Sequence, residues 1–61
     1  MPREVRREQL ILATIKCIEK IGLSGTTMAQ VTQEAGLSLG IANLHFESKD
    51  KLLVDTLEYV T

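Results

Sequence analysis

Side chains that can bind a phosphate or the edge of a base gather in the middle of this chain. They are the hydroxyls of Thr27 and Ser38, the amide of Asn43, the imidazole of His45 and the ammonium group of Lys49. Each can donate a hydrogen bond, and Lys49 carries a positive charge. Phosphate oxygens accept such bonds, and an Asn amide also pairs with adenine in a major groove. The chemistry that these residues offer is recognition of a polyanion.

The same residues do not assemble into a catalytic or metal-binding set. The serines have no His and Asp partners at spacings that suggest a triad, and Cys17 and His45 fall on different predicted helices. One Cys and one His cannot make a cysteine-rich zinc site or a pair of imidazole ligands. The stretch from Gly36 to Gly40 resembles a phosphate-cradling loop only superficially, because no Lys follows in register. We therefore expect no enzyme activity, no metal and no cofactor.

Length and charge indicate one small domain but name no partner by themselves. The chain has 61 residues, of which 44% are hydrophobic and 25% charged, with a net charge of −1. Arginines cluster in residues 3–7 and lysines in residues 49–51, whereas residues 21–46 carry one formal charge. A free thiol fits a reducing compartment. No apolar run approaches the roughly 20 residues that span a bilayer. We expect a cytoplasmic protein without a membrane partner.

An amphipathic helix is predicted over residues 3–21. The residues on its core-facing side recur at helical spacing: Leu10, Ile11, Thr14, Ile15, Cys17, Ile18 and Ile21. Gly22 stands where a C-terminal cap is expected, and residues 22–25 are predicted to form a loop. Because Cys17 lies on the core-facing side, we expect its thiol to be buried and inert.

Two short helices joined by a tight turn follow the first. Thr27 and Gln30 have the spacing of a capping box, so Thr27 is expected to begin a helix that Gly36 ends. Ser38 then caps a helix over Leu39 to His45, after a single intervening residue. Two helices joined so closely must cross at a steep angle, which is the geometry of a helix-turn-helix.

A fourth helix is predicted to start at Lys49, with Ser48 as its N-cap. It has no stop signal before the last residue, which predicts that the helix continues. The core is expected to contain Ile18, Val31, Leu37, Ala42, Phe46 and Leu53. We therefore expect an all-α, three-helix domain over residues 1–48, and residues 49–61 as the start of a helix that leads into a C-terminal domain.

Residues 26–53 carry the most specific pattern. Their sequence, TTMAQVTQEAGLSLGIANLHFESKDKLL, resembles the DNA-binding segment of the TetR family of bacterial transcriptional regulators. The family pattern is approximately T-apolar-x-x-I-A-x-x-A-G-V-S-x-G-x-x-Y-x-[YH]-F-x-x-K-x-x-L-L. Within the family, Gly40-Ile41 and His45-Phe46 are most similar to the betaine-pathway, choline-responsive branch. The basic start of the first helix is also family-like, so the resemblance covers nearly the whole chain.

This resemblance implies a homeodomain-like fold that binds a double-stranded DNA operator. It further implies a sequence-specific transcriptional regulator, most often a repressor, that forms a homodimer through a C-terminal domain binding a small-molecule effector. Such a bacterial protein lies in the cytoplasm and joins the nucleoid when bound to DNA. The alternative function is a small helical protein-interaction module. Cations on both sides of an uncharged recognition helix favour nucleic acid over that alternative.

The residues and the resemblance together define an expected DNA-binding set. It comprises Thr27, Ser38, Leu39, Gly40, Asn43, Leu44, His45, Lys49, Arg3, Arg6 and Arg7. A recognition helix brings its N-terminal turn to the bases, and Gly40 either permits close approach there or is merely tolerated. Thr27 and Ser38 combine capping with phosphate hydrogen bonds. The three arginines either touch the DNA backbone or minor groove or stay solvated.

Two positions depart from the family pattern and leave base recognition open. Asn43 replaces a Tyr that usually contacts phosphate, so it pairs with adenine, donates to a phosphate or stays solvated. Leu39 replaces a basic or polar residue and either meets a thymine methyl group or faces solvent. His45 and Lys49 are expected to contact phosphate. A cation in the first turn of a helix is unfavourable unless a phosphate lies against the same N-terminus.

Overall fold

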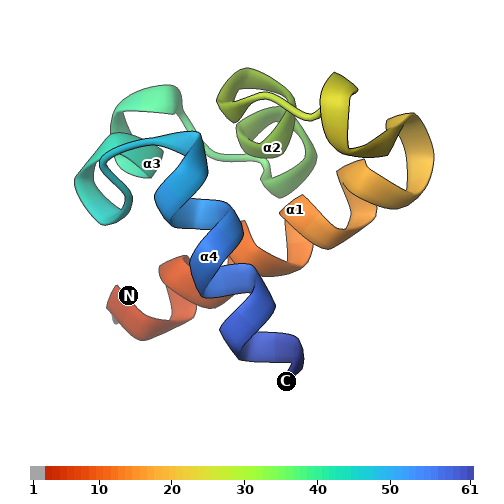
Figure 1. Ribbon diagram of the computed structural model, residues 1–61. Coiled ribbons are helices and arrows are strands. Elements are labelled where there is room, and N and C mark those ends of the chain that lie inside the picture. Colours follow the sequence, from red (N-terminus) through yellow and green to blue (C-terminus); the bar gives the residue numbers. More distant parts are fainter. Residues whose placement is uncertain (1–2) are drawn as a thin grey trace.

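The computed structural model describes the backbone from residue 3 to residue 61 and the side chains from residue 4 onward. It contains four helices: α1 (Arg3–Gly25), α2 (Met28–Ala35), α3 (Leu39–His45) and α4 (Lys49–Val60). α1 packs against both α2 and α4, and α2 packs against α3 (Figure 1). The described residues form no strand. The all-α, helix-turn-helix expectation is confirmed.

A residue with a side-chain hydroxyl is the N-cap of each of the three shorter helices. Thr27 Oγ1 accepts a hydrogen bond from the backbone N–H of Gln30 at an N···O distance of 3.1 Å. Ser38 and Ser48 cap α3 and α4 in the same way, each at 3.3 Å. An N-cap satisfies one of the backbone donors that a helix start leaves unpaired, so these three caps set where the helices begin.

The end of α1 differs from the prediction. The helix does not give way to a loop at residue 22; it kinks at Gly22, whose φ is 79°, and then makes one more turn to Gly25. Thr26 Oγ1 donates to the carbonyl oxygen of Gly22 at 2.8 Å and closes this turn. Glycine tolerates the positive φ. Ile21 was predicted to face the core but is 49% exposed, because the kink redirects the chain just beyond it.

The core lies where α1 meets α2 and α4. Its most deeply buried apolar side chains are Leu10, Ile11, Val31, Ala42, Phe46 and Leu52. The prediction was correct for Val31, Ala42 and Phe46, and Leu37 packs against the core while partly exposed. Ile18 and Leu53 are only partly buried, because they lie on the sides of α1 and α4 that α2 and α3 do not cover. Cys17 is buried, as expected.

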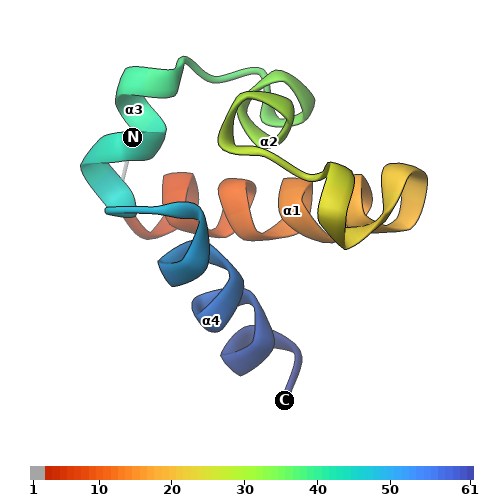
Figure 2. The same ribbon diagram turned by 45° about the horizontal axis from the view of Figure 1, so that its top comes forward.

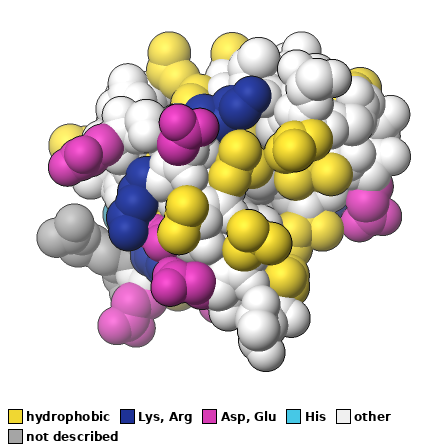
Figure 3. Space-filling model, in the orientation of Figure 1, with side chains coloured by type: hydrophobic (Ala, Val, Ile, Leu, Met, Phe, Trp, Pro, Cys, Tyr) yellow, Lys and Arg dark blue, Asp and Glu magenta, His cyan; other side chains and the backbone are white. Residues whose placement is uncertain are grey.

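An open apolar groove runs between the second half of α1 and the length of α4. It has a volume of about 520 Å³. The residues that line it are Ile15, Ile18, Glu19, Leu23, Leu53, Thr56, Leu57 and Val60. Figure 3 shows hydrophobic side chains gathered over this face of the molecule. No helix within residues 3–61 is long and apolar enough to cross a membrane.

Candidate nucleic-acid interface

The junction between α2 and α3 turns the chain within three residues. Gly36 adopts a left-handed conformation (φ 72°, ψ 28°) and its N–H donates to the carbonyl oxygen of Gln33 at 3.3 Å. The N–H of Leu37 donates to the carbonyl oxygen of Thr32 at 3.0 Å. These bonds end α2 while Ser38 is already positioned to begin α3. Figure 2 shows the two helices crossing steeply at this turn, as the sequence predicted.

One face of α3 is open to solvent and carries four of the predicted site residues. They are Leu39, Gly40, Asn43 and Leu44. Positions three and four residues apart lie side by side on a helix, so these four residues form one surface. Ala42, on the opposite side, is completely buried and holds α3 against the core. The exposed face of α3 therefore combines an amide and two apolar side chains around a glycine.

Gly40 leaves empty space on this face. A Cβ atom added there would meet only the Ser38 Oγ, at 3.9 Å. The backbone at Gly40 is not left-handed, so neither packing nor conformation within the described structure requires glycine. Glycine in a helix is less stable than alanine by roughly 0.5–1 kcal/mol. What glycine does provide is close access to the backbone from outside.

The capping hydroxyls at the starts of α2 and α3 keep a free donor. Thr27 and Ser38 use their oxygens to accept hydrogen bonds from the backbone. A hydroxyl has one O–H donor in addition to its two lone pairs, so the same group can also donate to a phosphate oxygen. Both side chains are on exposed residues at helix N-termini, where the helix dipole favours an anion. Capping and phosphate contact are therefore compatible at both positions.

His45 and Lys49 lie on either side of the break between α3 and α4. His45 is the last residue of α3 and Lys49 the first of α4, and both are partly exposed. Phe46 between them is buried and anchors this corner in the core. Among the described carboxylates, none lies within ion-pair distance of Lys49 or of Arg6. These two cations are available to an external anion.

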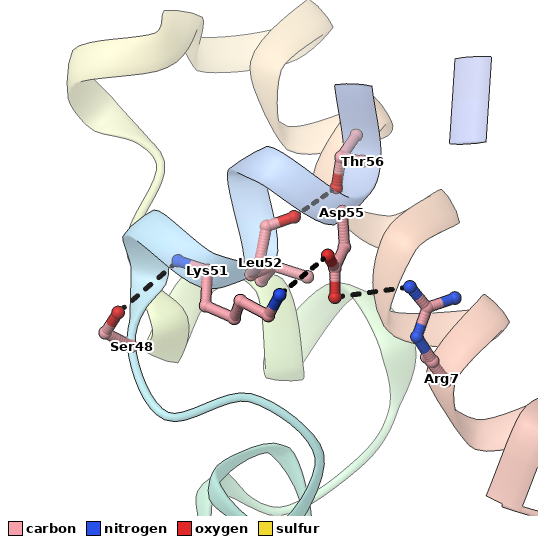
Figure 4. Close-up of polar contacts among 6 residues, drawn as sticks. All are labelled: Arg7, Ser48, Lys51, Leu52, Asp55 and Thr56. Carbon is pink, nitrogen blue, oxygen red and sulfur yellow. Dashed lines mark hydrogen bonds and ion pairs between the residues drawn. The ribbon is translucent and has the colours of Figure 1, made fainter. Parts of the chain in front are cut away.

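Arg7 has an intramolecular partner that the sequence did not reveal. Its Nη2 lies 3.2 Å from Oδ2 of Asp55, a buried carboxylate on α4, as Figure 4 shows. Lys51 Nζ approaches the other oxygen of Asp55 at 3.4 Å. The spacing of Lys51 and Asp55 on one helix predicts that pair, but nothing local indicates that α1 supplies the second cation. Arg3 was also predicted to bind DNA; its side chain lies outside the described residues.

Charge pairing shapes the ionisation of the few perturbed groups. Burial opposes ionisation of Asp55, but hydrogen bonds from Arg7 and Lys51 outweigh it and lower the pKa of the carboxyl. On the other side of the molecule, Lys20 donates to Glu34 at 2.8 Å, joining α1 to α2 and lowering the Glu34 pKa. Burial, assisted by Glu34, raises the pKa of the Cys17 thiol. A thiol with a raised pKa is a poor nucleophile, which agrees with the expectation that Cys17 is inert.

The described part of the chain thus has the architecture of a helix-turn-helix nucleic-acid-binding domain. Two helices that cross steeply at a short turn, with the second helix facing solvent, are the features of this class. Within this class, residues 10–56 match the family described as bacterial regulatory proteins, tetR family. The chain belongs to that family, as the sequence pattern predicted.

Curated relatives share the name HTH-type transcriptional regulator BetI. The chain is 52% identical over 58 residues to BetI of Burkholderia thailandensis, and 50% identical over 58 residues to BetI of Burkholderia cenocepacia and Burkholderia ambifaria. Each alignment covers 95% of this chain and 30% of the relative, so the chain spans about a third of their length. No solved structure matches the chain. These relatives are named as transcriptional regulators, the function that the sequence pattern implied.

Proposed function

We propose that this chain contains the DNA-binding domain, here called the reading head, of a transcriptional regulator. In this proposal α3 lies in the major groove of an operator. The observation that carries the proposal is the exposed face of α3, uncharged and open at Gly40, together with available cations at Arg6 on α1 and Lys49 at the start of α4. An uncharged helix surface suits base edges, whereas cations without an internal partner suit phosphates. A module that binds an apolar protein partner needs no such free cations.

Each interface residue has a role in this pose that follows from its chemistry. Asn43 reads an adenine through its amide, and the exposed side chains of Leu39 and Leu44 meet thymine methyl groups. His45 and Lys49 donate to phosphates on one side of the groove. The hydroxyls of Thr27 and Ser38 donate to phosphates near the N-termini of α2 and α3. Arg6 supplies a further backbone contact from α1.

The domain division is also part of the proposal. Residues 1–48 form the reading head, and residues 49–61 begin a helix that connects it to a C-terminal domain for dimerisation and effector binding. Two facts support this: the BetI relatives are more than three times as long, and the groove between α1 and α4 leaves apolar side chains uncovered. The similarity of Gly40-Ile41 and His45-Phe46 to the choline-responsive branch makes choline the first effector to test.

A salt titration tests the phosphate contacts. Binding of the 61-residue chain to a labelled duplex is followed by fluorescence anisotropy at several salt concentrations. Each phosphate contact contributes about 0.9 to the slope of log K against log salt, so Lys49→Ala should lower that slope by about one on every sequence. Lys16→Ala is the matched control, because this exposed cation of α1 lies roughly 15 Å along the helix from Arg6. An unchanged slope for Lys49→Ala removes Lys49 from the interface.

Asn43→Ala tests base reading separately from phosphate binding. A good bidentate contact to a base discriminates by about 1–3 kcal/mol, so the variant should lose preference at one operator position. Selection from a random duplex library, with the original chain and the variant in parallel, measures this preference. If Asn43→Ala weakens binding equally on every duplex, Asn43 does not read a base.

A further inference from the structure

Asp55 is the one buried carboxylate among the described residues. It is 7% exposed, and both of its oxygens face cations: Arg7 at 3.2 Å and Lys51 at 3.4 Å. A buried charge that lost one partner would be poorly solvated, so this arrangement holds all three side chains together. Asp55 belongs to α4 and Arg7 to the first turns of α1 (Figure 4). The pair therefore joins elements from opposite ends of the sequence.

Arg7 is held from a second direction by Phe46. The guanidinium carbon lies 5.8 Å from the centre of the Phe46 ring, within the range of a cation–π contact. Phe46 is the residue at the C-terminal end of α3 and is buried in the core. The start of α1, the end of α3 and the second turn of α4 thus meet around a single guanidinium. All three carry proposed phosphate contacts: Arg6, His45 and Lys49.

We infer that Asp55 is a positioning residue for the DNA interface that withholds Arg7 from phosphate. In this arrangement Arg6 and Lys49 contact phosphates, whereas Arg7 and Lys51 pair with Asp55. The Arg7–Asp55 pair also joins α1 to α4 next to the break that carries His45 and Lys49. The inference rests on the proposed function and refines the expected arginine set by separating Arg6 from Arg7. It assigns opposite roles to two adjacent residues of the same type.

The physical consequence is a difference in counterion release. DNA releases counterions only for the phosphates that a protein neutralises. The Arg7 side chain is 45% exposed, but its charge is already paired with the buried Asp55, so it should add less to the salt dependence than an unpaired cation. Replacing Arg6 should therefore change the salt slope, whereas replacing Arg7 should change the stability of the fold. A variant of Arg6 and the same variant of Arg7 therefore form a matched pair, because the two residues are adjacent and of the same type.

The first experiment compares Arg6→Gln with Arg7→Gln in the 61-residue chain. Affinity for a labelled random duplex is measured by anisotropy between low and physiological salt, and thermal unfolding by circular dichroism. We expect Arg6→Gln to lower the slope by about 0.9 with little change in Tm. Arg7→Gln should lower Tm and change the slope by no more than about 0.3, a third of the change expected for Arg6→Gln. A slope loss of about 0.9 for Arg7→Gln would overturn the inference.

The second experiment releases Arg7 by Asp55→Asn, with Asp50→Asn as the control. Asp50 is an exposed carboxylate in the first turn of the same helix, so both variants remove one negative charge from α4. Asp55→Asn should lower Tm and steepen the salt slope by at least about 0.9, because Arg7, and with it Lys51, becomes available to phosphate. Adding Arg7→Gln to it should remove about 0.9 of that steepening, and any remainder is the contribution of Lys51. Equal steepening in both Asp variants, or none in Asp55→Asn, would contradict the inference.

The design separates failure of this inference from failure of the proposed function. If the unaltered chain shows no salt-dependent binding to duplex DNA, the proposed function fails. If the unaltered chain binds duplex DNA with a clear salt dependence but Arg7→Gln lowers the slope as much as Arg6→Gln does, the proposed function stands and only the inferred role of Asp55 is contradicted. The two experiments can be interpreted independently, so if one variant does not fold, the other decides.

Discussion

The α2–α3 end of the molecule and the α1–α4 end expose surfaces of different chemistry. At the α2–α3 end, exposed leucines stand singly beside a glycine and an amide, and hydroxyl donors lie at the helix starts. At the α1–α4 end, apolar residues line one continuous groove, with Glu19 as its single charged lining residue. Mixed polar and apolar groups match base edges and phosphates, whereas a continuous apolar groove matches another apolar surface. The contrast agrees with the proposed function, in which α3 meets DNA and α4 leads into a C-terminal domain.

Phe46 lies in the core that the two ends share. It stops α3, lies under the guanidinium of Arg7 and is almost completely buried beside α4. The two surfaces are therefore not independent modules, although their chemistry differs. A change at the shared corner should affect both, whereas a change on either exposed face should affect one.

The largest expected effect comes from joining two reading heads. A tether attached beyond α4, which leaves the α2–α3 end free, makes the second DNA contact effectively intramolecular. This should tighten binding to a two-half-site operator by about 10²–10⁴-fold. The single chain should bind in the non-specific range of roughly 10⁻⁴–10⁻⁶ M at physiological salt. Anisotropy at about 150 mM salt measures both, and nanomolar binding by a demonstrated monomer would contradict the prediction.

Phe46→Ala should remove both surfaces at once by unfolding the domain. Truncating a buried Phe costs about 3–5 kcal/mol, and a domain of this length has on the order of 3–9 kcal/mol of total stability. Circular dichroism should show a large loss of helix or a greatly lowered Tm. Leu44→Ala is the control, since this leucine of α3 is 77% exposed and its loss should change stability by no more than about 0.5 kcal/mol. Equal Tm values for the two variants would show that Phe46 is not the shared corner.

Gly40→Ala should separate stability from DNA binding. Alanine gains roughly 0.5–1 kcal/mol in a helix relative to glycine, and its Cβ meets no obstacle inside the molecule. Tm should therefore rise while affinity for duplex DNA falls, because the methyl group holds the DNA away from α3. Gly25→Ala places a similar methyl on α1, outside the proposed interface, and should leave DNA affinity unchanged. Undiminished affinity in Gly40→Ala would mean that this glycine is only tolerated.

Leu57→Ser should have the smallest effect on this chain. Leu57 lies in the groove but is 65% exposed, so its replacement should change the free energy of unfolding by no more than about 0.5 kcal/mol. DNA affinity should also stay the same, because the change lies at the α1–α4 end. Chemical denaturation and anisotropy measure the two quantities. A destabilisation of 2 kcal/mol or more, of the order of the loss of a buried large side chain, would show that the groove is already covered in this chain.

The local features of the fold could be predicted from short-range signals in the sequence. Thr27, Ser38 and Ser48 begin helices and Gly36 ends one, as predicted, because a cap or a left-handed turn depends on residues three or four positions away. The exposed residues of α3 were also predictable, since they follow from those boundaries and helical spacing. The family pattern added the expected role of this surface, which local chemistry alone left open between DNA and protein.

Which side of each long helix is covered depends on how the helices pack against one another. Ile18 and Ile21 lie on the predicted core side of α1, yet the kink at Gly22 and the short length of α2 leave one half-buried and the other exposed. The sequence likewise gave no sign that Arg7 pairs with Asp55, because 48 positions separate the two and their meeting depends on how α4 crosses α1. Periodicity shows which residues share a face of a helix. What that face meets depends on contacts between elements distant in the chain, and those form only when the helices pack.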